Sequence, residues 1–453
     1  MASVDTADLV ERIWARDATV WTGADENRWL GWLDEPLRMQ ERVGQLEAFA
    51  HDALSAFDAV IVMGMGGSSL APEVLRRTFA SDAVQVLDTT HPGAIRRAVE
   101  EHDLDRTLFV ASSKSGTTLE TRSHLELFWT HVGKRGEQFV AVTDPGSELE
   151  ALARERGFRA VFAGEPTIGG RYSALSVFGM VPAALMNVDL GRLLERTEEM
   201  VEACRLDQGN PGLELGLELG QGWRDGRDKV IVNPNPGDFG LWVEQLLAES
   251  TGKERRGLVP APCESADGPD RQAAEVRIAD PYELGQEFYR WEVAAAVAGS
   301  ILGINPFDQP NVQEAKDRTN RILSTGAEAE LGPVGSLDEL LAGAEPGEYI
   351  CIQAFVDPVR YGEIEPLIRR ARETGRVVTH GIGPRYLHST GQLHKGGPPI
   401  GRFIQVVDDA GDELPIPGRD FGFGRLIRAQ AAGDAESLRE RGRPLVRVRL
   451  EDV

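Results

Sequence analysis

Two short segments of the sequence combine glycine with hydroxyl side chains, the residue types that hold a phosphate group. Residues 64–69 (Gly-Met-Gly-Gly-Ser-Ser) follow an apolar run and precede a helical pattern, and backbone N–H groups at the start of a helix form an anion site. Residues 112–118 (Ser-Ser-Lys-Ser-Gly-Thr-Thr) hold five hydroxyls, one lysine and one glycine. A helix N-cap needs one hydroxyl, whereas several donors and a charge can surround a phosphate. The residues expected to bind phosphate are Gly67, Ser68, Ser113, Lys114, Ser115, Thr117 and Thr118.

The first loop alone does not distinguish a phosphate site from a structural turn or a dinucleotide site. Asp88, at the end of the next apolar run, lies where a ribose-binding acid could be. However, the third glycine of that fingerprint would fall at position 69, which is serine, and no Gly-Lys-Ser/Thr ends the loop. His388 and His394 are six residues apart without further metal ligands nearby. We therefore expect no cofactor and no metal.

Apolar runs alternate with helical patterns along most of the chain, which predicts parallel sheets covered by helices. The expected strands are 58–63, 84–87, 107–111, 139–142 and 160–162, then 230–232 and positions near 258 and 276, then 349–355, 377–378, 403–407 and 445–450. We predict an α/β protein with two doubly wound parallel-sheet domains and an α/β C-terminal extension. The predicted boundaries are 1–50 for an N-terminal helical segment, 51–190 and 191–335 for the two domains, and 336–453 for the extension.

The composition argues against several classes of protein. With a net charge of −23 and a pI near 4.9, the surface repels nucleic acid and acidic membranes. No run approaches ~18 apolar residues, so we expect no membrane span, and residues 1–10 lack the pattern of a signal peptide. Cys204, Cys263 and Cys351 are far apart and odd in number, which favours free thiols in a reducing compartment. A cytoplasmic protein is expected.

The two loops resemble those of the sugar isomerase (SIS) domain, the phosphosugar-binding module of phosphoglucose isomerases and related regulators. Three further stretches narrow the resemblance to the isomerases. Residues 169–173 resemble the arginine loop of that family, 244–253 its catalytic glutamate segment, and 305–316 its lysine segment. With the stretch 383–395, the sequence is most similar to the isomerase half of fused transaldolase–isomerase proteins, and the resemblance covers most of the chain.

The resemblance implies a set of catalytic roles. Glu249 would be the base that shuttles a proton between neighbouring carbons, Arg171 the cation over the enediolate oxygens, and Lys316 an acid–base group for ring opening. Gln245, one helical turn before Glu249, and Gln309 would bind substrate hydroxyls. The implied reaction interconverts glucose 6-phosphate and fructose 6-phosphate through a cis-enediolate, and the family implies a possible homodimer.

One expected residue is missing from its usual place. Family members commonly use a histidine between the glutamate and lysine segments, which reaches into the site of the neighbouring subunit. Here no histidine lies between His131 and His380, and the corresponding helix, 286–293, offers carboxylates instead. We therefore expect a histidine of the C-terminal extension, His388 or else His394, to take part in ring opening, since histidine titrates in the useful range.

Other functions remain open at this point. A related isomerase could act on mannose 6-phosphate or a 6-sulfonated sugar, because the loops bind a tetrahedral anion and do not read ring stereochemistry. A non-catalytic sugar-phosphate sensor is a second alternative, but a sensor needs no base such as Glu249. A dinucleotide oxidoreductase is a third, and Ser69 argues against it.

Overall fold

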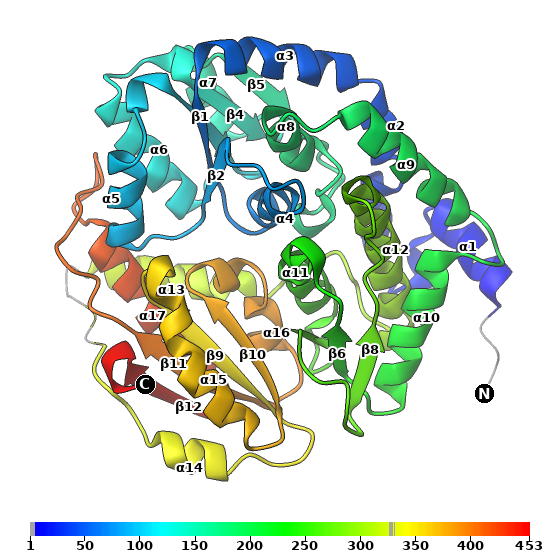
Figure 1. The fold of residues 1–453 in the computed structure, drawn as a ribbon. Coiled ribbons are helices and arrows are strands. Elements are labelled where there is room, and N and C mark those ends of the chain that lie inside the picture. The colour runs from blue at the N-terminus through cyan, green and yellow to red at the C-terminus, as the bar shows by residue number, and fades with distance from the viewer. Residues whose placement is uncertain (1–4, 326–328, 330) are drawn as a thin grey trace.

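The structure is a computed structural model that describes residues 5–325, 329 and 331–453, with only the backbone for 312–315. The described residues form three sheets in which all paired strands run parallel, surrounded by helices (Figure 1). The predicted α/β class with parallel sheets is confirmed.

The first sheet has the order β2-β1-β3-β4-β5. Its strands are β1 (Ala59–Met63), β2 (Val84–Leu87), β3 (Thr107–Ser112), β4 (Phe139–Thr143) and β5 (Ala160–Ala163). The connecting helices are α4 (Leu70–Thr78), α5 (Pro92–Glu100), α6 (Leu119–His131) and α7 (Glu148–Glu155), followed by α8 (Val177–Leu185). Because the chain winds outward from β1 in both directions, the loops after β1 and β3 meet at the carboxyl edge of the sheet, where ligands bind in such folds.

The second sheet is smaller and has the order β7-β6-β8. Its strands are β6 (Lys229–Val232), β7 (Val259–Pro262) and β8 (Arg271–Ala274), and its helices are α9 (Leu190–Ala203), α10 (Pro211–Arg224), α11 (Gly240–Thr251) and α12 (Leu284–Leu302). The strand expected near Val276 ends at Ala274. Val276 is buried but lies beyond the end of the strand. Its apolar side chain therefore indicated burial in the core and not a place in the sheet.

The third sheet has the order β10-β9-β11-β12. Its strands are β9 (Tyr349–Phe355), β10 (Val377–Ile382), β11 (Gly401–Val407) and β12 (Leu445–Arg449). The helices of this part are α13 (Val312–Ser324), α14 (Leu337–Ala342), α15 (Glu365–Arg372), α16 (Gly391–Gly396) and α17 (Phe423–Glu440). The strands of the three sheets fall within 59–163, 229–274 and 349–449, and the domain boundaries themselves stay a prediction.

The N-terminal helices α1 (Thr6–Trp14), α2 (Glu35–Gln40) and α3 (Val43–Ala56) form a layer on the first two units (Figure 1). The Trp21 indole donates to the carbonyl of Ala296 in α12 at 2.8 Å, and Trp32 stacks on Tyr172 with ring centroids 5.2 Å apart. Both tryptophans therefore bury apolar surface against elements distant in sequence, and Trp21 also satisfies its N–H donor there.

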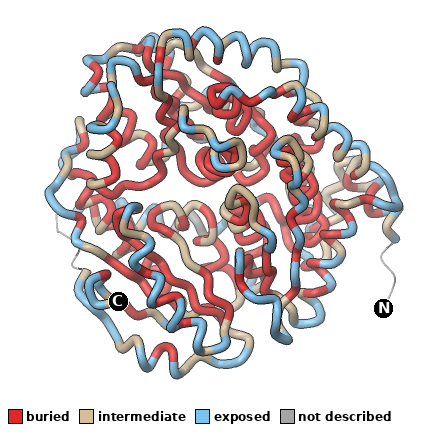
Figure 2. Tube along the Cα trace, viewed as in Figure 1, coloured by how far each residue is buried: buried red, intermediate tan, exposed pale blue. Residues whose placement is uncertain are grey.

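The C-terminal extension shares a core with the first sheet. Phe423 and Leu426 of α17 are buried in one cluster with Met63 and Phe109 of the first sheet, whereas the N-terminal layer packs into another cluster with Val60 and Val62. Figure 2 shows buried residues concentrated in the interior and exposed ones along the periphery. The extension is therefore part of the core of the folded chain rather than an appendage.

Among the described residues, no helix is long and apolar enough to cross a membrane.

Replacing Phe423 with alanine should destabilise the protein strongly. Phe423 is fully buried and stacks on His124 of α6, and truncating such a phenylalanine costs about 3–5 kcal/mol. The measurement is denaturant unfolding followed by fluorescence, with Val359→Ala as control because Val359 is 70% exposed. If Phe423→Ala unfolds like that control, α17 does not contribute to the shared core.

Candidate active site

A buried ion pair between Arg171 and Glu249 lies at the centre of the predicted site. Arg171 belongs to the turn η7 (Gly170–Tyr172), and its Nη1 donates to Glu249 at 3.3 Å and to Gln309 at 2.8 Å. Its Nε donates to Ser250 at 2.9 Å. The side chain of Arg171 is 1% exposed, and the guanidinium is held in one orientation by partners from two segments of the chain, α11 and the turn before α13.

The remaining donors of this guanidinium bind a turn that precedes α13. Arg171 Nη2 donates to the carbonyls of Pro306 and Asp308, at 2.7 and 2.9 Å. Lys253 binds the same turn, through the carbonyls of Asn305 and Asp308 and the Asp308 carboxylate. Burial and the Arg171 charge lower the pKa of Lys253 to about 7. The hydrogen bonds of Arg171 and Lys253 together hold the turn that carries Gln309.

Glu249 lies in α11, one helical turn after Gln245. Burial raises the pKa of Glu249, and the nearby Arg171 only partly opposes this effect. Gln245 Nε2 lies 3.5 Å from the Glu249 carboxylate and donates to the carbonyl of His388 at 3.0 Å. A carboxylate with a raised pKa, next to a fixed cation, is a competent proton acceptor.

The glycine loop allows three chain segments to approach one another. Gly66 has φ +56°, and a Cβ there would lie 2.7 Å from the carbonyl oxygen of His388. A Cβ on Gly67 would lie 1.9 Å from the carbonyl oxygen of Gly170, next to the catalytic candidate Arg171. Side chains at these positions would push the arginine turn and the C-terminal segment away, so the glycines serve close packing. Ser68 lies in the same turn and is buried.

The hydroxyl loop pairs its side chains across the turn. Ser113 bonds to Thr118 and Ser115 to Thr117, each at 3.0 Å. The Lys114 ammonium, by contrast, donates to Asp144 at 2.6 Å and to a neighbouring carbonyl. The structure therefore brings the hydroxyls of Ser113, Ser115, Thr117 and Thr118 together in one turn. It pairs Lys114 with the Asp144 carboxylate, which compensates the charge of the lysine.

A cavity of about 280 Å³ opens beside the hydroxyl loop. It is bounded by residues from the first unit, α13 and the C-terminal extension, and those that could do chemistry are Thr117, Thr118, Glu120, Lys316, His388 and Gln430. The exposed Lys316 lies on α13 and its charge contributes to lowering the pKa of Glu120. The cavity thus joins predicted residues from sequence positions up to 271 apart, from 117 to 388.

His388 is held by a chain of hydrogen bonds that crosses between units. Its Nε2 lies 2.8 Å from Glu120 Oε1, and that oxygen also accepts from Gln430 Nε2 at 2.6 Å. Gln430 Oε1 in turn accepts from the Thr90 hydroxyl at 2.7 Å. Burial alone would raise the pKa of Glu120, but the charge and hydrogen bond of His388, with Lys316 nearby, lower it to about 2. Glu120 is therefore an ionised partner that orients the imidazole.

The other candidates for the ring-opening histidine lie elsewhere. His394 is buried against Cys351 at 3.5 Å and Gln353 at 3.3 Å, and burial lowers its pKa well below the usual value. In α12, Glu287 forms a buried pair with Arg290 at 2.7 Å. Neither His394 nor Glu287 lines the cavity, and of the two expected histidines only His388 does.

Comparison with known proteins identifies the family. A sequence model of phosphoglucose isomerase matches residues 38–202. A glucose-6-phosphate isomerase of Synechococcus sp. strain JA-3-3Ab is 32% identical over 377 residues, covering 74% of this chain and 67% of its own. This chain belongs to the phosphoglucose isomerase family. The resemblance predicted from the sequence motifs is confirmed, and the finer likeness to fused transaldolase–isomerase proteins stays a prediction.

Other family members match shorter parts. The glucose-6-phosphate isomerase of Nostoc sp. is 31% identical over 267 residues, 51% of each chain. The chain therefore spans about half the length of the first curated relatives it matches. Among solved structures, a glucose-6-phosphate isomerase from Chlamydia trachomatis has a TM-score of 0.59 at 20% identity, covering 71% of this chain and 84% of its own. At that identity, the likeness shows the fold.

Sequence reasoning missed two polar residues that line the cavity. Glu120 follows the hydroxyl loop by two residues, so a carboxylate in the first turn of the helix was a readable signal. Gln430 lies on α17, 310 residues later, and no local pattern marks it. The side chains of 312–315, within the predicted lysine segment, lie outside the described residues.

Replacing Glu120 with glutamine should change how stability depends on acidity. A carboxyl whose folded pKa is about 2 adds stability above its unfolded pKa of about 4.3, and this contribution is lost as the pH falls toward 2. Glu120→Gln should therefore be destabilising near neutral pH, and its difference from wild type should shrink below about pH 4.5. Urea unfolding across that range measures the effect. The exposed-site variant Glu101→Gln should stay parallel to wild type at every pH, and the same behaviour in Glu120→Gln would contradict an ionised Glu120.

Proposed function

We propose that the chain is an aldose–ketose isomerase that interconverts glucose 6-phosphate and fructose 6-phosphate through a cis-enediolate. The observation that carries the proposal is the buried Glu249 held 3.3 Å from Arg171. The charge of His388, which lines the cavity with hydroxyls and Lys316, is close enough to oppose the rise that burial causes in the pKa of Glu249. The reaction needs a carboxylate base near two neighbouring carbons, a cation at the enediolate oxygens, and an acid–base pair that opens the ring.

In this proposal, Glu249 removes the proton from C2 of the open-chain aldose and returns it to C1. Burial makes the carboxylate a stronger base. Arg171 neutralises the negative charge that develops on the oxygens of C1 and C2, and its fixed orientation means that no reorganisation is needed during the reaction. Gln245 and Gln309 contact this pair directly and are suited to bind substrate hydroxyls.

In this proposal, residues that line the cavity beside the hydroxyl loop open the sugar ring. His388, oriented by Glu120, exchanges a proton with the ring oxygen or the C1 hydroxyl, and Lys316, which lines the same cavity, is a second acid–base group for this step. The hydroxyls of Ser113, Ser115 and their threonine partners would hold the phosphate. In this proposal the ring-opening histidine comes from the same chain as Glu249, and a homodimer and a cytoplasmic location stay predictions.

Two alternative functions of this site can be named. The hydroxyl loop would bind any tetrahedral group at C6, so a mannose 6-phosphate or 6-sulfonated sugar is a possible substrate class, decided by an assay across these sugars. A non-catalytic sensor is less well supported, because the raised pKa of Glu249 and its pairing with a buried guanidinium have no use in simple binding.

Replacing Glu249 with glutamine should lower turnover by at least ~100-fold, the scale for losing a general base. The amide keeps the shape of the side chain, so folding and sugar-phosphate binding should persist. A coupled assay from glucose 6-phosphate measures the loss, with the exposed Glu254→Gln as a control of equal charge change. Turnover like wild type in Glu249→Gln would remove this residue from the mechanism.

Replacing Ser113 and Ser115 together with alanine should raise KM more than it lowers kcat. The phosphate is remote from the reacting carbons, so its contacts hold the substrate without changing the chemical step. Each lost hydrogen bond to a charged group should cost roughly 1.5–3 kcal/mol. Calorimetry with fructose 6-phosphate checks the binding, and the surface variant Ser55→Ala serves as control. Unchanged affinity in the double variant would place the phosphate elsewhere.

Replacing His388 with alanine should impair ring opening selectively. Turnover of the cyclic sugar should fall, while proton exchange on a substrate that is already open-chain should be retained, because Glu249 performs that step. The control is His51→Ala, which lies exposed on α3. His394→Gln should leave the ratio of the two activities unchanged even if it lowers stability, since His394 lies outside the cavity. An unaltered ratio in His388→Ala would exclude a role in ring opening.

A further inference from the structure

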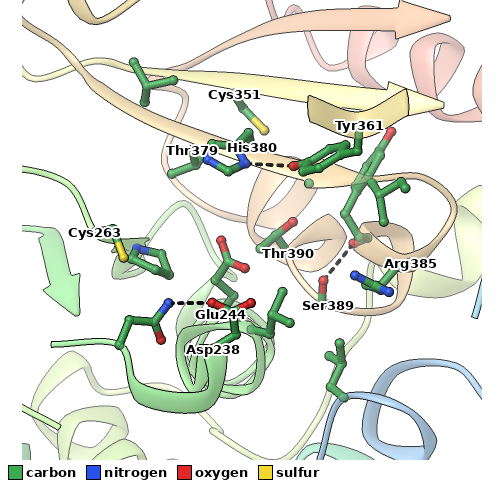
Figure 3. Close-up of a pocket in the computed structure, with 18 of the residues that line it drawn as sticks. Asp238, Glu244, Cys263, Cys351, Tyr361, Thr379, His380, Arg385, Ser389 and Thr390 are labelled. Carbon is green, nitrogen blue, oxygen red and sulfur yellow. Dashed lines mark hydrogen bonds between the residues drawn. The ribbon is translucent and has the colours of Figure 1, made fainter. Parts of the chain in front are cut away.

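A second cavity, of about 450 Å³, lies where the first two units meet the C-terminal extension (Figure 3). Its volume is typical of small-molecule sites, which span roughly 300–1,000 Å³. One wall comes from α4, the turn η8 (Pro236–Asp238) and α11, and the other from β10 and the turns η10 (Pro358–Ile364) and η11 (Arg385–His388). None of the proposed catalytic residues lines it.

The arginines at this cavity are each paired with carboxylates. The pairs are Arg77 with Glu73 and Asp238, Arg372 with Glu264, and Arg385 with Asp88. Glu244 of α11 is the carboxyl of the cavity lining that is not paired with an arginine. Within the described part of the chain, it has no hydrogen bond or ion pair, and Figure 3 shows its carboxyl group directed into the space between α11 and β10. The wall therefore carries one uncompensated acidic group and no uncompensated cation to attract an anion.

The environment of Glu244 makes this acid weak. Burial raises its pKa to about 8, and the charge of Arg385 only partly opposes the shift. A cavity that holds only water thus leaves the carboxyl protonated at neutral pH. Removing that proton becomes favourable when a cation takes its place, because an ion pair in a poorly solvated cavity is stronger than one in water.

The remaining polar groups of the cavity are neutral hydrogen-bonding partners. The Tyr361 hydroxyl lies 2.7 Å from His380 Nδ1, and burial lowers the pKa of His380 and raises that of Tyr361. Among the described residues, the buried Thr379 hydroxyl has no hydrogen-bond partner other than the neighbouring Cys351 thiol, and Thr390 faces the same space (Figure 3). Burial also raises the pKa of the Cys351 thiol to about 12. Such a lining suits the hydroxyl groups of a polyol.

We propose that this cavity is a second ligand site, which binds a small polyhydroxylated molecule bearing a primary ammonium group, with Glu244 as the counter-ion. The ammonium would replace the proton of the carboxyl, and the ligand hydroxyls would bond to Thr379, His380 and Thr390. The turn η11 lies in the wall of this cavity and also carries His388, so a bound ligand would contact the segment that supplies the proposed ring-opening group.

The test compares 1-amino-1-deoxysorbitol with sorbitol by titration calorimetry on the full chain in phosphate-free buffer. The two probes differ only in an ammonium against a hydroxyl group. The amine should bind about tenfold more tightly, the scale of one charge-assisted hydrogen bond. Its affinity should be about fivefold higher at pH 8 than at pH 7, because Glu244 must lose its proton to pair with it. Equal binding of the two probes, or no binding of the amine, would overturn the proposal.

Glu244→Gln locates the binding. The amide imitates the protonated acid, so the fold should be kept, the preference for the amine should disappear, and sorbitol should bind as before. Glu254→Gln, with the same change of charge on an exposed residue of the same region, should keep the preference. A preference retained in Glu244→Gln would place the amine elsewhere and sink the proposal. Since calorimetry needs no turnover, this outcome is separate from any failure of the proposed isomerase function.

Discussion

The buried pairing of Arg171 with Glu249 is the interaction on which the rest of the site depends. Removing a guanidinium and a carboxylate from water is costly, and their attraction compensates only when the other donors and acceptors are satisfied. Ser250, Gln309 and two carbonyls of the turn before α13 complete the guanidinium. The buried pair therefore depends on the position of this turn, and Lys253 also binds the turn.

That requirement extends to the backbone around the pair. The arginine turn can approach the glycine loop only because Gly67 leaves room for the carbonyl of Gly170, and the C-terminal segment reaches Gln245 only because Gly66 leaves room for the carbonyl of His388. Glycines after a first strand are usually taken as a phosphate signal. Here close packing requires glycine at the same positions. The presence of these glycines alone therefore does not distinguish a phosphate-binding loop from a closely packed turn.

The sequence predicted those features that are encoded locally. Apolar runs located β1, β3, β9 and β11 to within a residue or two, because strands buried on both faces are continuously apolar. The clustering of Arg171, Gln245, Glu249 and Gln309 followed from motif resemblance. The partners of Lys114 and His388 did not, since Asp144 and Glu120 reach them through tertiary contacts that no spacing in the chain expresses. Likewise, the choice between His388 and His394 depended on which side of the η11–α16 segment faces the cavity.

The C-terminal extension links stability to the proposed chemistry. One face of α17 supplies Phe423 and Leu426 to the core beneath the first sheet, and the same helix supplies Gln430 to the carboxylate that orients His388. A shift of α17 that loosened the core would therefore also move the hydrogen-bond donor of Glu120. Because the extension provides both His388 and the glutamine that binds the carboxylate partner of His388, the part of the chain that packs on the first sheet is also the part that completes the proposed site.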